Sequence, residues 1–317
     1  MAIVKMNKFT LLAFEKDKEE LLKRLQEFEG VQFVDLKPQL ENEELSFLKT
    51  LASDKKTLDL QEKISKIKFC LDYLKPYTEK KGALQSLKEG TKTISFKELE
   101  DSVKTINWNK IYDELKSRED RVNELSNEET KIKTDIVSLE PWKNFDGKFQ
   151  DLYDLKLTSY FLGTIPLALK NDLMESLEES KLQYYFEEIN ITKDEIYILA
   201  MTLKEYEKDF SEILRTFGFS RISLSYSGNP VETIKELQGK VKSIYDEKES
   251  IVSELKKFNK CEEDLELVYE YYSNELCREN AKLNFLESNN IVVIQGWNTV
   301  SNSKTLETIV KKMSKNP

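Results

Sequence analysis

The feature that most constrains the fold is a seven-residue repeat of apolar side chains between Pro230 and Ser288. Steps of three and four residues, taken alternately from Ile234, reach 16 positions, of which 13 are apolar or aromatic. Such a repeat favours a helix in a left-handed coiled coil. One continuous helix of this length would measure about 90 Å. Because a single apolar seam is not stable in water, this helix needs partner helices.

Three positions of the seam carry charged side chains instead, namely Lys248, Glu262 and Glu279. We interpret them as fixing the register between helices rather than as binding a ligand. Tyr269 and Tyr272 also lie on the seam, and core packing accounts for both.

Two upstream segments are candidate partner helices. Residues 41–75 carry apolar side chains at mostly three- and four-residue spacing, and a second run extends over 95–140, where Pro141 ends it. The break between them holds residues that disfavour helix: Pro76, Gly82 and Gly90. Helices of about 50 and 65 Å, laid end to end with some overlap, could accompany the returning helix. A hairpin of the two would advance only about 15 Å, which is too little.

Residues 141–228 change from helical periodicity to an alternation of strand and helix patterns. The predicted strands are 156–165, 182–190, 195–202 and 220–226, and the predicted helices are 166–180 and 203–217. This order, β-α-β-β-α-β, is the split βαβ or ferredoxin-like arrangement. We therefore expect a small α/β lobe here.

The two ends of the chain together form most of a second unit of this kind. The predicted strands are 2–14, 31–36 and 291–297, and the predicted helices are 17–29 and 303–313. Gly30 is placed to cap the first of these helices. The final strand of the unit is missing, so we expect the chain to stop inside a domain.

The strand at 291–297 follows a long helical pattern, so its expected partners are the strands 2–14 and 31–36. Gly296 is expected to permit the turn out of the strand. Trp297 is expected to pack where the terminal lobe meets the helices. We interpret Gly30, Gly296 and Trp297 as structural residues.

These patterns predict an α+β protein in which two small split-βαβ (ferredoxin-like) lobes are joined by a long antiparallel coiled coil, giving a dumbbell. The segments are a discontinuous proximal lobe (1–40 plus 289–317), outgoing helices (41–140, with a break near 76–94), a distal lobe (141–228) and a returning helix (229–288).

The chain lacks histidine altogether, which excludes Ser–His and Cys–His nucleophile pairs and the usual zinc sites. No GxxxxGK[ST], GxGxxG, HExxH or GxSxG motif occurs. Cys70, Cys261 and Cys277 lie far apart, as is typical of free thiols on helices. We predict no catalytic residue, no cofactor and no metal.

Charge and hydropathy narrow the classes of partner. The formal net charge is −9, which does not favour binding to nucleic acid. We interpret the acidic clusters 187–188 and 262–264 as solvated surfaces rather than as acid/base pairs. No apolar run approaches the roughly 18 residues that span a bilayer, and the N-terminus lacks the layout of a signal peptide. We therefore expect a soluble, cytoplasmic chain.

Three consecutive aromatic residues, Tyr184, Tyr185 and Phe186, lie on a predicted strand of the distal lobe. Because side chains alternate along a strand, both faces of the sheet receive a ring. One face packs on the helices, and the other, in an open sheet, is free to bind a partner or the coiled coil. We regard these three residues as candidates for partner binding.

Both ends of the chain resemble a known family. The opening MAIVKMNKFTLLAFEKDKEELLKRLQEFEGVQFVDL resembles that of subunit I of V-type (A/V-type) ATPases, the counterpart of the eukaryotic a subunit. The stretch VVIQGW is similar to the family's hydrophobic–glycine–tryptophan element, although Asn298–Thr299 replaces the usual valine–proline. The coiled coil and the distal lobe match in layout rather than by motif.

The resemblance implies a mechanical role without catalysis. Subunit I of the family acts as a stator, whose soluble N-terminal half holds the peripheral stalks of E and G subunits and approaches the C subunit of the central stalk. Its membrane half carries the proton or sodium half-channels. The resemblance implies that this chain is the cytoplasmic arm, which joins the stalks to its own C-terminal membrane domain and resists torque.

Two other classes of function stay open. A soluble coiled-coil tether or scaffold unrelated to a pump would be complete at residue 317 and would not bind E–G dimers. An enzyme or ligand sensor would need a Gly-rich loop or convergent polar residues in a pocket, and the sequence shows neither. The stator arm instead predicts a reading frame that continues with a strand and then apolar segments of about twenty residues.

Overall fold

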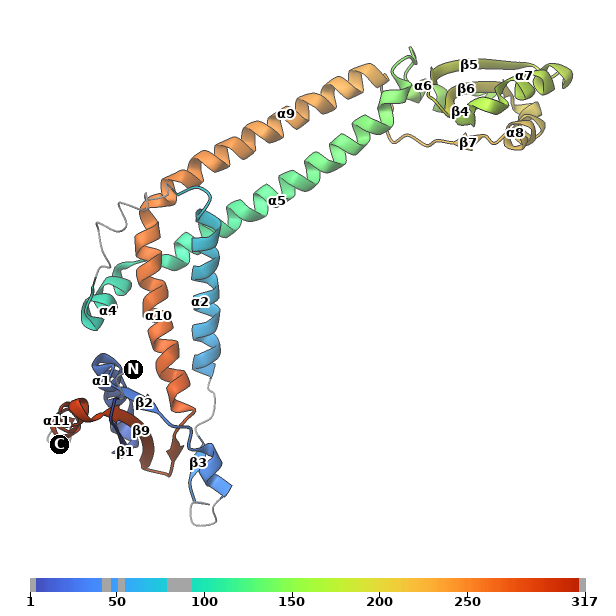
Figure 1. Ribbon diagram of the computed structural model, residues 1–317. Coiled ribbons are helices and arrows are strands. Elements are labelled where there is room, and N and C mark those ends of the chain that lie inside the picture. The colour runs from blue at the N-terminus through green and yellow to red at the C-terminus, as the bar shows by residue number, and fades with distance from the viewer. Residues whose placement is uncertain (1–3, 42–46, 51–54, 79–92, 314–317) are drawn as a thin grey trace. The chain divides into compact units, whose positions relative to one another are not determined.

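The computed structural model describes residues 4–41, 47–50, 55–78 and 93–313. The chain divides into two compact units, of which unit 1 comprises Met1–Arg118 and Val252–Pro317, and unit 2 comprises Glu119–Ile251. Each unit contains one antiparallel sheet and part of the long helices (Figure 1). The chain is therefore an α+β protein with two antiparallel sheets, as predicted. The ferredoxin-like type of the lobes and the dumbbell arrangement stay predictions.

The sheet of unit 1 is built around β9 (Ile291–Thr299). β1 (Met6–Phe14) pairs antiparallel with β9 along all nine residues of each strand. On the other side of β9, β2 (Val31–Phe33) pairs with its second half. The predicted pairing of the C-terminal strand with both N-terminal strands is confirmed.

The C-terminal strand also has a local partner, which the sequence did not reveal. β8 (Leu286–Glu287) forms a short antiparallel pair with β9, and β3 (Lys49–Thr50) pairs with β8. Leu286, the last apolar position of the predicted seam, therefore lies in the sheet, where it packs with the buried Leu36 and Leu48. The returning helix ends earlier than predicted, at Lys282.

Two helices, α1 (Lys18–Phe28) and α11 (Ser303–Met313), cover one face of this sheet. Their inward residues and those of β9 form one core, whose buried members are Leu21, Leu22, Leu25, Phe285, Val292, Ile294 and Leu306. Phe9, Leu11 and Ala13 of β1 pack against this core. Because side chains alternate along a strand, the even-numbered residues of β1 lie on the opposite face.

The other helices of unit 1 pack around α10 (Glu262–Lys282). α2 (Lys55–Leu74) and α4 (Phe96–Thr105) both pack on it. The start of α5 (Trp108–Leu139) lies beside α2, because the rings of Tyr112 and Phe69 are 5.8 Å apart. The start of α5 therefore overlaps α2.

The predicted outgoing helices are shorter than the apolar pattern. The first begins at Lys55, since 37–41 form a 3₁₀ turn and β3 follows. Leu45, Leu51, Gly82 and Gly90 lie outside the described residues. The second run is divided between α4 and α5 at Ile106, which is extended (φ −85°, ψ 116°) and so cannot continue a helix.

The returning helix is interrupted as well. α9 (Pro230–Leu255) and α10 are separated by a 3₁₀ segment, Lys256–Cys261. Before it, several predicted seam positions are buried, namely Ile234, Leu237, Ile244 and Ile251, whereas Val241 is half-buried. After it, the predicted positions Leu265 and Glu279 are buried, and Val268 is buried although it was not predicted. The seam therefore continues past the 3₁₀ segment and takes in one further residue.

Unit 2 contains a lobe whose sheet order is β5-β6-β4-β7, with all neighbours antiparallel. In chain order its elements are β4 (Thr158–Pro166), α7 (Lys170–Glu179), β5 (Tyr184–Ile191), β6 (Glu195–Leu203), α8 (Glu207–Thr216) and β7 (Ser220–Arg221). This is the predicted β-α-β-β-α-β order. The last strand has only two residues, fewer than predicted.

Candidate interaction surfaces

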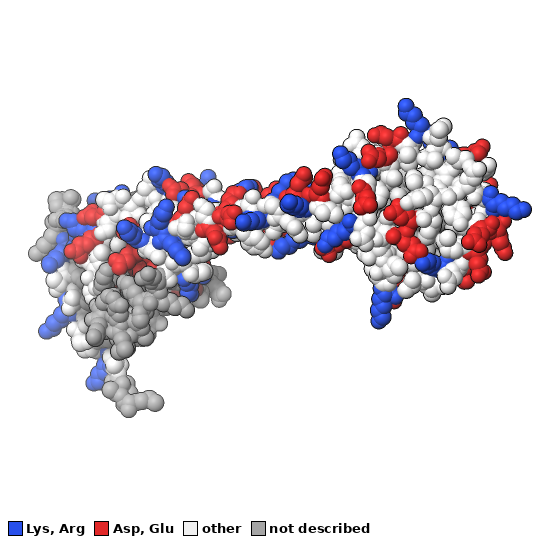
Figure 2. Space-filling model, turned by 90° about the horizontal axis from the view of Figure 1, so that it is seen from above, with Lys and Arg blue, Asp and Glu red and all other residues white. Residues whose placement is uncertain are grey.

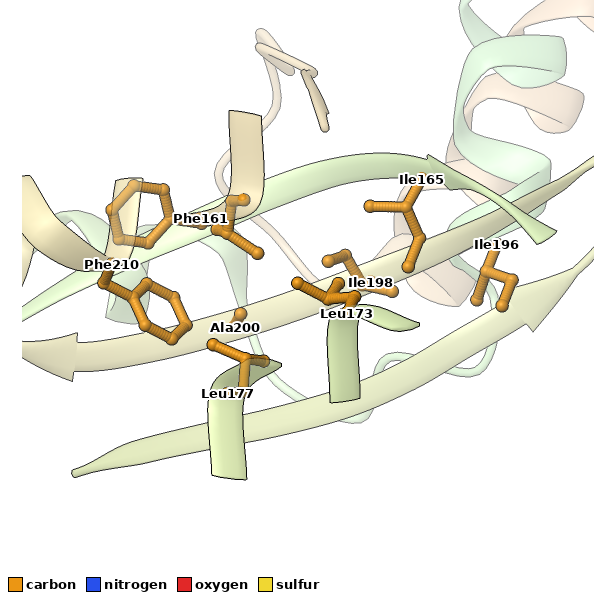
Figure 3. Close-up of a cluster of buried hydrophobic side chains, with 9 residues drawn as sticks. Phe161, Ile165, Leu173, Leu177, Ile196, Ile198, Ala200 and Phe210 are labelled. Carbon is orange, nitrogen blue, oxygen red and sulfur yellow. The ribbon is translucent and has the colours of Figure 1, made fainter. Parts of the chain in front are cut away.

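One face of the sheet in the distal lobe forms a closed apolar core with α7 and α8. Figure 3 shows side chains of β4 and β6 meeting those of both helices. The buried members are Phe161, Ile165, Leu173, Leu177, Ile196, Ile198, Ala200, Phe210 and Leu214. The lobe thus presents a rigid support for whatever lies on the opposite face of the sheet.

The three aromatic candidates on β5 divide between the two faces, as the alternation predicts. Tyr184 and Phe186 pack against the core, and the Tyr184 ring lies 6.1 Å from that of Phe210. Tyr185 points the other way and is 49% exposed. Its hydroxyl donates to the Glu187 carboxylate at 2.8 Å, a hydrogen bond that raises the pKa of the tyrosine. Of the three, Tyr185 is the one with a ring available to a partner.

Most of the opposite face is not free, contrary to the prediction for an open sheet. The indole of Trp142, which is fully buried, meets the ring of Tyr197 edge-on at 5.4 Å. Nearby, the ring of Tyr153, on the short helix α6 (Phe149–Tyr153), lies 5.8 Å from that of Tyr160. Its hydroxyl donates to the carbonyl of Leu224 at 3.1 Å. The segment before the lobe therefore covers this face of the sheet.

A shallow depression of about 320 Å³ lies at the edge of this covered area. Its lining residues are Leu155, Thr158, Gln183, Tyr184, Tyr185, Met201, Thr202 and Leu203. Leu157, next to the lining residue Thr158, is 79% exposed. Figure 2 shows that one face of this lobe has a broad area free of acidic and basic side chains. We define the distal surface as Leu155, Leu157, Tyr185 and Met201.

The prediction that Gly30 caps α1 is wrong. The left-handed residue at the end of this helix is Glu29, with φ 55°, and its amide donates to the carbonyl of Gln26. A Cβ at Gly30 would lie 2.6 Å from Cε1 of Phe28, so a larger residue here would have to displace this ring.

Gly296 does not permit a turn out of the strand, because β9 continues through it to Thr299. A Cβ at this position would lie 2.6 Å from Cζ of Phe9 and 2.7 Å from the carbonyl oxygen of Gln32. A glycine inside a strand often marks such a close approach. Trp297 is 40% exposed on β9, and its packing where the lobe meets the helices stays a prediction.

A buried ionic cluster joins the helices of unit 1. Glu279, one of the charged seam positions, accepts hydrogen bonds from Lys56 of α2 and, at 2.8 Å, from Lys282 of its own helix. Lys282 also donates to Glu19 of α1. Burial acts to raise the pKa of Glu279, but the two lysines outweigh it and hold this pKa below its usual value. The cluster links three helices at one level, in keeping with the predicted role in register.

A second cluster joins α5 and α9 within unit 2, close to the solvent. Glu129 accepts from Lys133 at 2.6 Å, from Lys248 at 2.7 Å and from the hydroxyl of Tyr245 at 2.8 Å. These hydrogen bonds lower the pKa of Glu129 to about 2. Next to them, Arg121 binds both carboxylate oxygens of Glu247, at 2.7 and 3.1 Å. Lys248 thus forms an interhelical contact, as expected of a residue that sets register.

The described part of the chain contains no group of three or more His, Cys, Asp or Glu residues arranged to hold a metal ion. Burial raises the pKa of the Cys70 thiol to about 12, so it stays protonated and unreactive at neutral pH. No described helix is long and apolar enough to cross a membrane.

No model of a protein family matches the sequence. A-type ATP synthase subunit I of Methanocaldococcus jannaschii is 22% identical over 328 residues, which cover 98% of this chain and 47% of the relative. The chain is homologous to A-type ATP synthase subunit I. It spans about half the length of that protein.

Among solved structures, the crystal structure of the cytoplasmic N-terminal domain of subunit I, homolog of subunit a, of V-ATPase aligns with 96% of this chain and 97% of that chain. The TM-score is 0.49 and the sequence identity is 11%.

Proposed function

We propose that this chain is the cytoplasmic arm of subunit I in a rotary V/A-type ATPase, where it acts as a non-catalytic stator. In this role it links the peripheral stalks of E and G subunits to the membrane sector, approaches the C subunit of the central stalk, and continues into its own membrane domain. The observation that carries the proposal is the match to subunit I along 98% of the chain.

The contacts between the long helices support a part that bears load. A stator has to keep its helices from sliding past one another while torque acts along them. The buried Glu279 cluster fixes α2, α1 and α10 at one level. The bidentate pair of Arg121 with Glu247 does the same for α5 and α9, because two parallel hydrogen bonds restrict both distance and angle.

The distal surface is the site that we assign to the E–G stalk. It combines an exposed tyrosine with exposed leucine on a rigid sheet, and aromatic residues are enriched where protein partners bind. Tyr185 is held in place by Glu187, so little side-chain freedom is lost when a partner binds.

A binding titration of the chain with a purified E–G dimer tests this proposal. The double variant Leu157→Glu/Tyr185→Glu should weaken binding by about tenfold or more, because it buries charge in an apolar contact. The matched control is Val137→Glu, which also replaces an exposed apolar residue (70% exposed) in the same unit but outside the distal surface. It should bind like the wild type.

The titration also separates the proposal from its main alternative, a soluble tether unrelated to a pump. If the wild-type chain fails to bind the E–G dimer while the two lobes are folded, the alternative is favoured. If all three proteins bind equally, the stator function stands but the distal surface is not the contact.

A further inference from the structure

Four connections from a strand to a helix in this chain have the same construction. In each one a strand of nine residues is followed by a three-residue 3₁₀ turn and then by a helix of ten or eleven residues. The connections are β1 to α1, β4 to α7, β6 to α8 and β9 to α11. Two of them lie in each lobe.

One backbone hydrogen bond recurs in all four connections. The first residue of each 3₁₀ turn donates its amide to the carbonyl of the residue that precedes the neighbouring antiparallel strand. The four bonds are Glu15 to Asn290 (3.0 Å), Val300 to Lys5 (3.1 Å), Leu167 to Asp194 (2.9 Å) and Lys204 to Leu157 (3.1 Å). Each lobe is therefore built from two copies of one unit, placed antiparallel to each other.

The third strand of each lobe is added in the same register. In the distal lobe Tyr184 of β5 lies opposite Thr202, the eighth residue of β6. In the proximal lobe Val31 of β2 lies opposite Asn298, the eighth residue of β9. Thr202 and Asn298 are both buried polar residues. The proximal lobe thus repeats the distal lobe strand for strand, with β1, β2 and β9 in the places of β4, β5 and β6.

The distal lobe has a fourth strand, β7, on the outer edge of β4. Within 4–41, 47–50, 55–78 and 93–313 no strand lies on the corresponding outer edge of β1. β1 is nonetheless as long as β4 and pairs along its whole length on the other side. A regular strand of this length with one unpaired edge is a template for adding a further strand.

The hydrogen bonds identify which groups of β1 face that edge. In an antiparallel pair, directly opposed residues alternate between bonded and non-bonded, and the bonds at Glu15 and Lys5 assign the odd-numbered residues to β9. The amides and carbonyls of Thr10 and Leu12 therefore point to the outer edge. The equivalent group in the distal lobe, the carbonyl of Leu162, accepts the amide of Ile222, which follows β7, at 2.9 Å.

We propose that the outer edge of β1 accepts a fourth, antiparallel strand at Thr10 and Leu12, supplied by the residues that follow α11 in the full-length protein. In the distal lobe the strand starts at Ser220, close behind Thr216 at the end of α8. The proximal strand would likewise follow α11, which ends at Met313, and would lie beyond the described residues. The relative's greater length is consistent with such a continuation. The inference goes beyond the stator function and does not depend on it.

Site-resolved hydrogen exchange tests the proposal on the 317-residue chain and on the full-length protein. The amides of Thr10 and Leu12 should exchange at least about tenfold more slowly in the full-length protein, because they gain hydrogen bonds. The amides of Phe9 and Leu11 bond to β9 in both proteins and serve as internal controls. Equal exchange at Thr10 and Leu12 in the two proteins would overturn the proposal.

A proline at the edge gives an independent test. Leu12→Pro removes an outward amide, which is tolerated on an edge strand, so it should leave the 317-residue chain folded. In the full-length protein the same variant should abolish the extra protection at Thr10. The matched control Leu11→Pro removes an amide bonded to β9 and should unfold the lobe in both proteins.

Two further outcomes would contradict the proposal. A reading frame that ends at residue 317 leaves no segment to supply the strand. Protection at Thr10 and Leu12 that rises with the concentration of the 317-residue chain would show that a second copy occupies the edge instead. Failure of the chain to bind an E–G dimer would bear on the stator function and leave this inference unaffected.

Discussion

The two lobes share a construction but differ in what covers the second face of each sheet. In the distal lobe the chain covers this face itself, with Trp142 on Tyr197 and Tyr153 on Tyr160. In the proximal lobe Leu12 and Phe14 stay 71% and 60% exposed on the corresponding face. The same supersecondary unit therefore leaves different surfaces exposed, depending on the segments that flank it.

The largest expected loss of stability comes from removing Trp142, which covers one face of the distal sheet. Trp142→Ala should lower the free energy of unfolding of unit 2 by about 3–5 kcal/mol, since the indole is fully buried. The matched substitution in the other lobe, Trp297→Ala, should cost less, because that indole is 40% exposed. Urea unfolding followed by circular dichroism measures both. Equal losses would show that the two faces do not differ as described.

The next largest effect should distinguish the two ionic clusters. Glu279→Ala removes one of the two carboxylates that Lys282 binds and leaves this buried lysine with Glu19, so unit 1 should lose about 1–3 kcal/mol of stability. In unit 2, Glu129→Ala affects groups near the solvent, where water screens ion pairs, so the loss of stability should be smaller. Thermal unfolding of both variants compares them. A larger loss for Glu129→Ala would contradict the difference in burial.

The pH dependence of the stability of unit 2 should be traceable to Glu129. Its pKa in the folded state is about 2, below the ordinary value of 4.5, so the unfolded chain binds the proton more tightly. The stabilisation is therefore fully present above pH 4.5 and is lost as the pH falls from 4.5 towards 2. Urea midpoints of the wild type should fall across this window, and those of Glu129→Gln should fall less. If the urea midpoints of the two proteins fell in parallel, the Glu129 cluster would not be the source of the pH dependence.

The smallest effect is expected at the exposed face of the proximal sheet. Leu12→Ser and Phe14→Ser replace exposed side chains, so each should change the stability of unit 1 by no more than about 0.5 kcal/mol. Leu36→Ala, at a fully buried position of the same unit, should cost about 2–5 kcal/mol and serves as the contrast. A large loss at Leu12 would mean that this face is covered after all.

The sequence predicted the elements that have strong periodicity. The pairing of β9 with β1 and β2 was predictable, because an isolated apolar strand needs partners and the N-terminal strands were the ones available. The order of elements in the distal lobe followed from alternating patterns in the same way. The two-residue strands β3, β7 and β8 carry no periodicity, so the sequence did not define their bounds.

The errors at single residues have physical causes. A glycine can mark either a turn or a place where other atoms come close to the backbone. Gly296 is of the second kind, because the ring of Phe9 lies against it. The end of the first helix uses Glu29 rather than Gly30 as the left-handed residue. Trp142 was missed as the cover of the distal sheet, although an aromatic residue directly after a helix-ending proline was a readable signal. The start of α4 was readable too, because Ser95 and Glu98 form a capping box.

We propose that the distal lobe contacts a peripheral stalk. A photo-crosslinking residue placed at position 185 of the intact ATPase complex tests it directly, with position 137 as the control. We expect an adduct between position 185 and the E or G subunit, and none from position 137. Adducts from position 185 to other subunits only, or from both positions equally, would contradict it.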